Sequence, residues 1–270
     1  MKVLIATDLS EASLAALDSV CSCASGVFTE ATLLHVIDLD HYTAGGSIPQ
    51  LIEYANKVLP AWAERLTECG IETRVRVEQG PAAETIEDIA IDADSDLVVM
   101  TSLGRGAATG RVFGSTVERV ASRGRIPVLV ERVHEREGAW CRLDGGSPFA
   151  RLLLAANMDD SLQSLLGYVA GLPGESALRA VHVAGTHEEV ASAESGLRAA
   201  ATAAALPNAE ISVLVGDPVD TIVREADAWG ATTVAVSSCR HSVLHRAIWG
   251  SVARGVARNA HCSVLLVPPS

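Results

Sequence analysis

The chain has 270 residues and carries 21 lysines and arginines against 33 aspartates and glutamates, a formal net charge of −12. Hydrophobic residues make up 49% and charged residues 20%, a composition that argues against a disordered chain. The acidic balance argues against nucleic acid as the main partner, and no apolar run reaches the roughly 18 residues that a membrane helix needs. The length favours two domains.

The start of the chain favours a cytoplasmic protein. An acidic residue, Asp8, follows the first short apolar run, which leaves no room for the apolar core and cleavage site of a signal peptide. The cysteines are scattered without CxxC pairs, and in a reducing compartment we expect them to be free thiols. They are Cys21, Cys23, Cys69, Cys141, Cys239 and Cys262.

Short apolar runs along the first half predict β-strands. A further strand is indicated where Ile71, Thr73, Val75 and Val77 alternate with charged residues, which is typical of a strand exposed on one side. The continuous apolar runs suit strands that are covered on both faces. They are Val3–Thr7, Thr32–Ile37, Leu97–Met100 and Pro127–Val130.

Helix-favouring segments separate these strands. Strand-helix alternation predicts an α/β fold with a parallel, doubly wound sheet and right-handed crossovers. In such sheets ligands bind beyond the carboxyl ends of the strands, so we searched after Ala6, Val36 and Met100. The expected helices are Ser10–Cys23, Ile48–Cys69 with Gly70 as the stop, Ala82–Ala93 and Ser115–Ser122.

The second half repeats the first. Lys2–Ser10 matches Arg151–Asp159 at an offset of 149 residues, and later matches keep a constant offset of 136, which indicates a tandem duplication. The later matches are Gly80 with Gly216, Thr85-Ile86 with Thr221-Ile222, Gly114-Ser115 with Gly250-Ser251, and Val128-Leu129 with Val264-Leu265.

A polar, turn-rich segment lies between the two halves. It predicts a first domain at 1–133, a linker at 134–148 and a second domain at 149–270. An extra edge strand around Trp140 is the alternative interpretation of this segment.

A glycine-rich loop and a helix start follow Met100. Glycine lets backbone N–H groups approach a ligand closely, and a helix start offers unpaired donors. Ser115 and Thr116 add hydroxyl groups, and Arg105 and Arg111 suit phosphate oxygens. A surface loop with a serine N-cap is the alternative.

The loop resembles the nucleotide loop of the universal stress protein family, reading Thr101-x2-Gly104-x9-Gly114-Ser115 with threonine in place of the first glycine. If the family has glycine there because the backbone needs a positive φ, threonine would be strained. If the position requires only a small side chain, threonine can serve. The family's other segments are matched by Ala6-Thr7-Asp8-Leu9-Ser10, by Leu34-His35-Val36 and Val181-His182-Val183, and by Pro127-Val128-Leu129-Val130.

The resemblance implies two tandem Rossmann-like domains, each with a five-stranded parallel sheet, paired about a pseudo-twofold axis. It implies ATP, ADP or AMP as ligand, with Mg²⁺ as an optional companion of ATP. Asp8 would hold the ribose and the Val36 backbone the adenine. The implied binding residues are Thr7, Asp8, Val36, Thr101, Gly104, Arg105, Gly114, Ser115 and Thr116.

The second half departs from this pattern. Asn157 replaces Asp8, and Ser237 and Arg240 replace both loop positions, so we expect a degenerate loop that does not bind ATP in the family's way. The arginines of this loop favour the alternative that the second half binds another anionic ligand or an acidic peptide. A zinc site is disfavoured, because no carboxylate completes the set of Cys239, His241, His245 and His261.

No enzyme motif is present: GxSxG, HExxH and GxxxxGK[ST] are all missing. At most, the resemblance allows slow ATP hydrolysis or autophosphorylation on Ser115 or Thr116. We therefore expect a stress-response sensor or regulator that binds an adenine nucleotide in its first domain. The alternative is a nucleotide-independent scaffold that acts through protein partners, and a homodimer is compatible with both. The histidines of the second strands, His35 and His182, are expected to be hydrogen-bonded edge residues rather than catalysts.

Overall fold

The computed structural model describes residues 1–23, 26–38, 47–103, 114–142, 146–174, 176–237 and 250–269. The chain divides into two compact units, Met1–Val120 with Val128–Gly145 and Ala121–Pro127 with Gly146–Ser270. Both have the doubly wound α/β fold that the strand-helix alternation predicts. No helix in these ranges combines the length and the hydropathy needed to cross a membrane.

The first unit alternates strands and helices, at bounds close to those predicted. Its elements are β1 (Lys2–Thr7), α1 (Glu11–Cys21), β2 (Glu30–Ile37), α2 (Ile48–Glu68), β3 (Glu72–Gln79), α3 (Ala82–Asp92), β4 (Leu97–Leu103), α4 (Ser115–Arg123), β5 (Val128–Arg136) and β6 (Ala139–Arg142).

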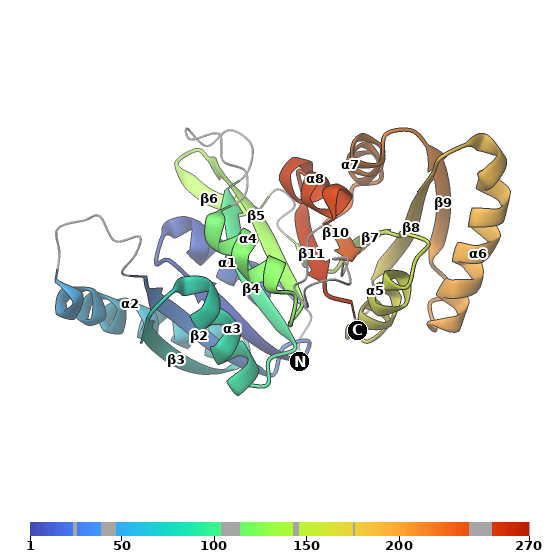
Figure 1. The fold of residues 1–270 in the computed structure, drawn as a ribbon. Helices are drawn as coiled ribbons and strands as arrows, with labels where there is room; N and C mark the ends of the chain where they lie inside the picture. The colour runs from blue at the N-terminus through green and yellow to red at the C-terminus, as the bar shows by residue number, and fades with distance from the viewer. Residues whose placement is uncertain are drawn as a thin grey trace. The chain divides into compact units, whose positions relative to one another are not determined.

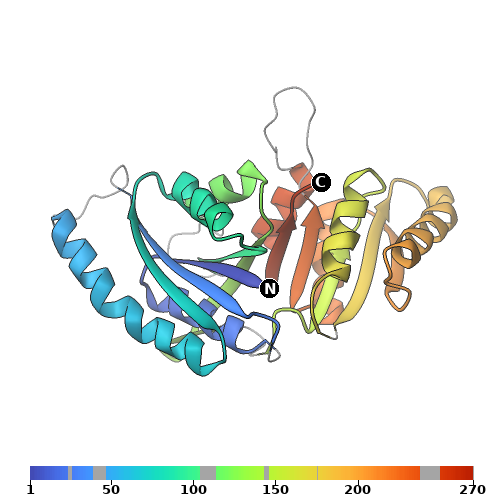
Figure 2. The ribbon, with the colours of Figure 1, turned by 90° about the horizontal axis from the view of Figure 1, so that it is seen from below.

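Five of these strands are parallel and follow the order β3-β2-β1-β4-β5. The helices α1 and α2 cover one face of the sheet, and α3 and α4 cover the other (Figures 1 and 2). The central strands are apolar because both of their faces are buried, and Leu4 of β1 and Leu97 of β4 are fully inaccessible. Strand order reverses beside β1, so the crevice expected for a ligand lies at the carboxyl ends of β1, β2 and β4.

Two local signals set the bounds of the helices. Ser10 caps α1, since its hydroxyl accepts a hydrogen bond from the Ser13 backbone N–H at 3.2 Å. Past the end of α2, Gly70 has a φ of +84°, a left-handed conformation that glycine adopts without strain. The predicted helix stop at Gly70 is therefore confirmed.

The linker predicted at 134–148 is wrong over its first nine residues. β5 continues to Arg136, and β6 returns antiparallel to it through the two-residue turn Glu137-Gly138. Both turn residues have positive φ, at +54° and +81°, as the tight turns of β-hairpins require. The alternative edge strand around Trp140 is thus present. The hairpin is stable because Trp140 packs against the buried residues Ala12, Ala15 and Val133.

The end of the predicted linker belongs to the second unit. The Pro148 carbonyl accepts hydrogen bonds from the hydroxyls of Thr232 and Thr233, at 2.9 and 2.7 Å. Phe149, the next residue, is buried. Residues 143–145 of the predicted linker lie outside the described ranges.

The second unit repeats the parallel sheet, in the order β11-β10-β7-β8-β9. Helices α5 and α6 cover one face, and α7 and α8 cover the other (Figure 1). The elements are β7 (Arg151–Ala155), α5 (Ser161–Ala170), β8 (Ala177–Ala184), the 3-10 helix η1 (His187–Glu189), α6 (Val190–Ala203), β9 (Glu210–Val215), α7 (Pro218–Trp229), β10 (Thr233–Ser237), α8 (Ser251–Asn259) and β11 (Ser263–Val267).

The repeated glycines show why the duplication is visible in the sequence. Gly80 and Gly216 have φ values of +144° and +153°. A Cβ atom on either would lie 3.0 or 2.8 Å from the hydroxyl oxygen of Thr85 or Thr221. Both strand-to-helix turns need glycine. The two glycines are therefore retained and remain visible as a sequence match at an offset of 136 residues.

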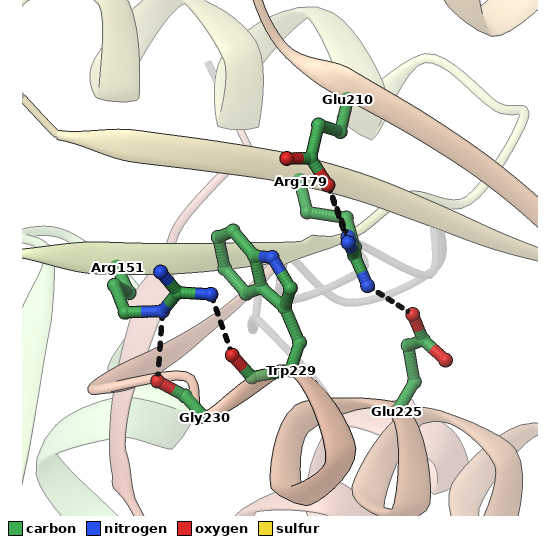
Figure 3. Close-up of polar contacts among 6 residues, drawn as sticks. All are labelled: Arg151, Arg179, Glu210, Glu225, Trp229 and Gly230. Atoms are coloured by element: carbon green, nitrogen blue, oxygen red, sulfur yellow. Dashed lines mark hydrogen bonds and ion pairs between the residues drawn. The ribbon is translucent and has the colours of Figure 1, made fainter.

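Arg151, the basic residue that opens the second repeat, has a structural role. Its guanidinium donates to the carbonyls of Trp229 and Gly230 at 2.6 and 3.1 Å. It also lies 4.3 Å from the centre of the Trp229 ring (Figure 3). Arg179 lies 4.8 Å from the same ring and pairs with Glu225 at 2.7 Å and with Glu210. These contacts tie α7 to β7, β8 and β9 and stabilise the second unit.

Candidate functional site

A cavity of about 680 Å³ opens in the first unit at the carboxyl ends of β1, β2 and β4. We call it the Asp8 cleft. The start of α4 and one side chain of β6 complete its wall. Its lining includes Thr7, Asp8, Val36, Thr101, Gly114, Ser115 and Thr116 among the residues predicted to bind nucleotide. Two other predicted residues, Gly104 and Arg105, lie outside the described ranges, as does Arg111.

Asp8 sits in a tight turn that fixes its carboxylate. Leu9 follows it with a φ of +63°, which is uncommon for leucine, and the Leu9 N–H donates to the Thr7 hydroxyl at 2.9 Å. The Ser10 N–H donates to Asp8 Oδ1 at 3.0 Å, and the Ser13 hydroxyl donates to the same oxygen. Among the described residues no donor reaches Oδ2, so that oxygen is available to a ligand.

The hydrogen bonds also set the charge of Asp8. Desolvation by burial raises the pKa of this carboxyl, but the hydrogen bonds from Ser10 and Ser13 outweigh it and hold the pKa below its usual value. Asp8 is therefore a carboxylate at neutral pH and acts as an acceptor. A ligand hydroxyl or amino group is the natural partner of such an oxygen.

His35 lines the cleft beside Asp8 and ties β2 to β1. Its Nδ1 lies 2.9 Å from the Thr7 carbonyl oxygen. A carbonyl can only accept, so Nδ1 carries a proton and donates it. In the second unit His182 Nδ1 donates to the Ala156 carbonyl at 3.0 Å. The expectation of hydrogen-bonded edge histidines is confirmed for both.

Thr101 is not strained. It lies within β4, opposite Glu131 of β5, and the strand conformation has a negative φ. Threonine therefore meets the backbone requirement of this position without the cost that a left-handed conformation would impose. At the start of α4, a Cβ atom on Gly114 would contact only Val117, at 3.9 Å. Packing within the described residues does not require glycine at this position.

Sequence reasoning missed several side chains of the Asp8 cleft. Asp38 lines it and accepts a hydrogen bond from the Ala82 N–H at 3.2 Å, at the start of α3. Trp140 reaches the cleft from β6. A smaller cavity of about 340 Å³ shares Asp8, His35 and Asp38 with the cleft. The further missed residues are Ser10, Glu11, Ala12, Ser13, Leu34, Ala82, Ile86 and Val117.

The corresponding turn of the second unit is arranged differently. The Asp159 carboxylate accepts from the Asn157 side chain at 2.5 Å and from the Ser161 N–H at 2.9 Å. The Ser161 hydroxyl in turn lies 2.7 Å from the Ser237 hydroxyl. These side chains hydrogen-bond to one another through both oxygens of Asp159, whereas the Ser10 and Ser13 donors both reach one oxygen of Asp8. Arg240 and Arg246 lie outside the described ranges.

The disfavoured zinc set is only partly described, since Cys239, His241 and His245 lie outside the described ranges. His261 pairs with Asp227 at 2.9 Å. Within the part of the chain that the structure describes, no three His, Cys, Asp or Glu side chains cluster as metal ligands would.

The fold and the cleft define a doubly wound α/β protein with two repeated units and a polar crevice at the strand ends of the first. The family model described as "Universal stress protein family" matches residues 1–132 and 151–268. The chain therefore belongs to the universal stress protein family, in a tandem arrangement.

Several known proteins are similar to this chain in sequence or in fold. A universal stress protein of Methanocaldococcus jannaschii is 28% identical over 143 residues, which cover 50% of this chain and 84% of that protein. The crystal structure of a universal stress protein from Archaeoglobus fulgidus covers 100% of this chain and 96% of its own, with a TM-score of 0.76 and 22% identity. That similarity shows the shared fold. A universal stress protein solved in complex with cAMP covers 45% of this chain and 98% of its own, with 22% identity and a TM-score of 0.39.

Proposed function

We propose that this universal stress protein binds an adenine nucleotide in the Asp8 cleft and acts as a stress-response sensor or regulator. One observation carries the proposal: the residues that the family resemblance assigns to the base, the ribose and the phosphates line a single cavity, as far as they are described. These residues come from β1, β2, β4 and α4, so a binding site is expected only when the unit is folded.

The chemistry of the wall supports a nucleotide with its base toward β2. The Asp8 carboxylate suits ribose hydroxyls, and the backbone at Val36 suits the edge of an adenine. Ser115 and Thr116 present hydroxyls and N–H groups at the start of α4, where a phosphate is favoured. ATP, ADP and AMP all fit this scheme, and Mg²⁺ would come with ATP rather than occupy a site of its own.

Fast phosphoryl transfer is not part of the proposal. The sequence has no Walker motif, and the structure shows no cluster of metal-ligating side chains among its described residues. Nucleotide occupancy, rather than turnover, is therefore the signal that we propose. The described cysteines are free thiols, which is consistent with action in the cytoplasm.

Isothermal titration with ATP tests the proposal. We expect micromolar binding to the wild-type protein and at least about tenfold weaker binding to Gly114→Ala, a loss of roughly 1.4 kcal/mol. Among the residues that the structure describes, alanine at Gly114 would meet only Val117, so weaker binding would reflect the ligand. The matched control is Gly250→Ala at the equivalent start of α8, where φ is −59° and alanine is unstrained. This control should bind ATP as the wild type does.

The same titration decides between the two functions. Absence of binding to ATP, ADP and AMP up to millimolar concentrations would contradict the proposal and favour the nucleotide-independent scaffold. Equal loss of binding in Gly114→Ala and Gly250→Ala would mean that the cleft is not the site.

A further inference from the structure

Two cysteines distant in the sequence meet at the ends of two helices, away from the residues that line the Asp8 cleft. Cys21 is the last residue of α1 and Cys69 is the C-cap of α2. The Cys21 Sγ lies 3.9 Å from the Arg65 carbonyl oxygen, and the Cys69 backbone N–H donates to that same oxygen at 3.3 Å. The Cys21 thiol and the Cys69 backbone therefore contact the same carbonyl group, which places the two cysteines side by side.

The two thiols differ in their surroundings. Cys69 is exposed, whereas Cys21 is half-buried. Burial, together with the neighbouring Cys69 thiol, raises the pKa of the Cys21 thiol to about 12. Asp18 and Arg65 form an ion pair of 2.7 Å close by; Asp18 disfavours a thiolate at Cys21 and Arg65 favours one. Cys21 thus stays protonated and donates to the Arg65 carbonyl, and the exposed Cys69 is the thiol that meets an oxidant first.

We propose that Cys21 and Cys69 form a reversible oxidation site at which hydrogen peroxide converts the dithiol into a disulfide linking α1 to α2. The Cys69 thiolate attacks a peroxide oxygen, the O–O bond breaks, and hydroxide leaves and takes up a proton to form water. Cys69 is then a sulfenic acid. Cys21 next loses its proton and its sulfur attacks the Cys69 sulfur, which breaks the S–O bond and releases a second water. Two thiols are oxidised and one peroxide is reduced.

The neighbouring Cys23 provides a matched control. It lies two residues from Cys21 and is also half-buried, but its thiol hydrogen-bonds to the Ser19 carbonyl, at 3.6 Å. If proximity to a second thiol determines the reaction, Cys21 reacts with Cys69 and Cys23 does not.

Peptide mapping of the reduced full-length protein tests the proposal. The protein is treated with equimolar hydrogen peroxide, alkylated with N-ethylmaleimide and digested with trypsin without reduction. Trypsin places Cys69 in peptide 66–74 and both Cys21 and Cys23 in peptide 3–57. We expect these two peptides to be linked, with a mass about 2 Da below their sum, and the link to disappear on reduction with dithiothreitol.

Variants identify the partners in this link. The link should persist in Cys23→Ser and be lost in both Cys21→Ser and Cys69→Ser, with Cys69 of the Cys21→Ser variant proceeding to sulfinic acid. Phenylarsine oxide, which bridges neighbouring thiols, should bind the wild type and Cys23→Ser at one equivalent and neither of the other two variants. The proposal is overturned if saturating peroxide leaves wild-type Cys21 open to alkylation while Cys69 becomes sulfinic acid. It is also overturned if the link persists in Cys21→Ser.

Discussion

Asp8 lines the cleft with its carboxylate held in place by two donors to one of its oxygens. The Ser10 N–H and the Ser13 hydroxyl both donate to Oδ1, and they come from the turn and the first turn of α1. The side chain is therefore oriented before any ligand arrives. Preorganisation of this kind lowers the entropic cost of binding.

Replacing Asp8 with asparagine should destabilise the protein at neutral pH, by about 0.5 kcal/mol after solvent screening. The hydrogen bonds hold the folded-state pKa of Asp8 below its unfolded value of 3.8. A depressed carboxyl pKa contributes stability above the unfolded pKa and loses it as the pH falls through the folded pKa. Urea unfolding at about pH 7 and about pH 3 measures the difference between wild type and Asp8→Asn, which should shrink on acidification. A difference that grows at low pH would contradict this account.

The role of an individual residue could be predicted where its position in a strand or turn determines that role. Asp8, Thr7 and Val36 follow or end predicted strands, so their place at the cleft follows from the parallel fold. Ser13 and Asp38 were missed because a hydrogen bond across three or more residues, or between separate elements, brings them to the site. Nothing in their local sequence distinguishes them from ordinary helix and loop residues.

At the scale of elements, the strand-to-helix turns at Gly80 and Gly216 tolerate substitution poorly. Alanine at either position combines a positive φ with a Cβ contact of 3.0 Å or less to a threonine hydroxyl. We expect a loss of about 2 kcal/mol of unfolding free energy for each. Gly138→Ala is the comparison, since its φ is +81° but its Cβ would meet nothing within 4 Å, and about 1 kcal/mol is expected. Chemical denaturation of the three variants would show equal losses if the threonine contacts were irrelevant.

The β5–β6 hairpin should depend on Trp140. This side chain packs against Ala12 and Ala15 of α1 and against Val133 of β5, and it also lines the Asp8 cleft. Trp140→Ala should cost about 2 kcal/mol, less than a fully buried tryptophan, and Trp140→Phe should recover more than half of the loss. Thermal unfolding monitored by circular dichroism measures both. An unchanged midpoint in Trp140→Ala would mean that the hairpin contributes no stability to the unit.

Elements of regular periodicity were predicted well, and the hairpin was not. Long apolar runs and the stop at Gly70 gave bounds within a few residues of those observed, except that β5 continues to Arg136 instead of ending at Val130. The sequence around Glu137-Gly138 is polar and rich in turn residues, which is equally typical of a linker. The packing of Trp140 against α1 distinguishes a hairpin from a linker. This contact joins residues more than 120 positions apart, so the local sequence does not reveal it.

For the molecule as a whole, the two units should respond differently to ligand. If the proposed function holds, ATP at about 100 times its dissociation constant stabilises the first unit by about 2.7 kcal/mol, a shift of roughly 8 °C. Trp229→Leu should instead lower the unfolding temperature of the second unit, because Arg151 and Arg179 lose the ring between them. Differential scanning calorimetry with and without ATP measures both effects. If ATP raised only the unfolding temperature of the transition that Trp229→Leu lowers, the nucleotide would bind to the second unit and not to the first.

The duplicated architecture could be predicted from the sequence, whereas the difference between the two strand-end turns could be predicted only in part. Asn157 signalled that the second turn departs from Asp8. The Asp159 carboxylate accepts hydrogen bonds from Asn157 and Ser161. These bonds could not be predicted, because they depend on side-chain positions that are set only in the folded unit.

The paired glycines have a consequence for how such a chain evolves. Both copies keep the turn that their folding requires, while the side chains at the strand ends have diverged in one of them. A protein with two compact copies in one chain can change the chemistry at the strand ends of one copy while both keep the glycine turns of the fold. The carboxyl-terminal copy is where a new specificity could arise at the lowest risk to the old one.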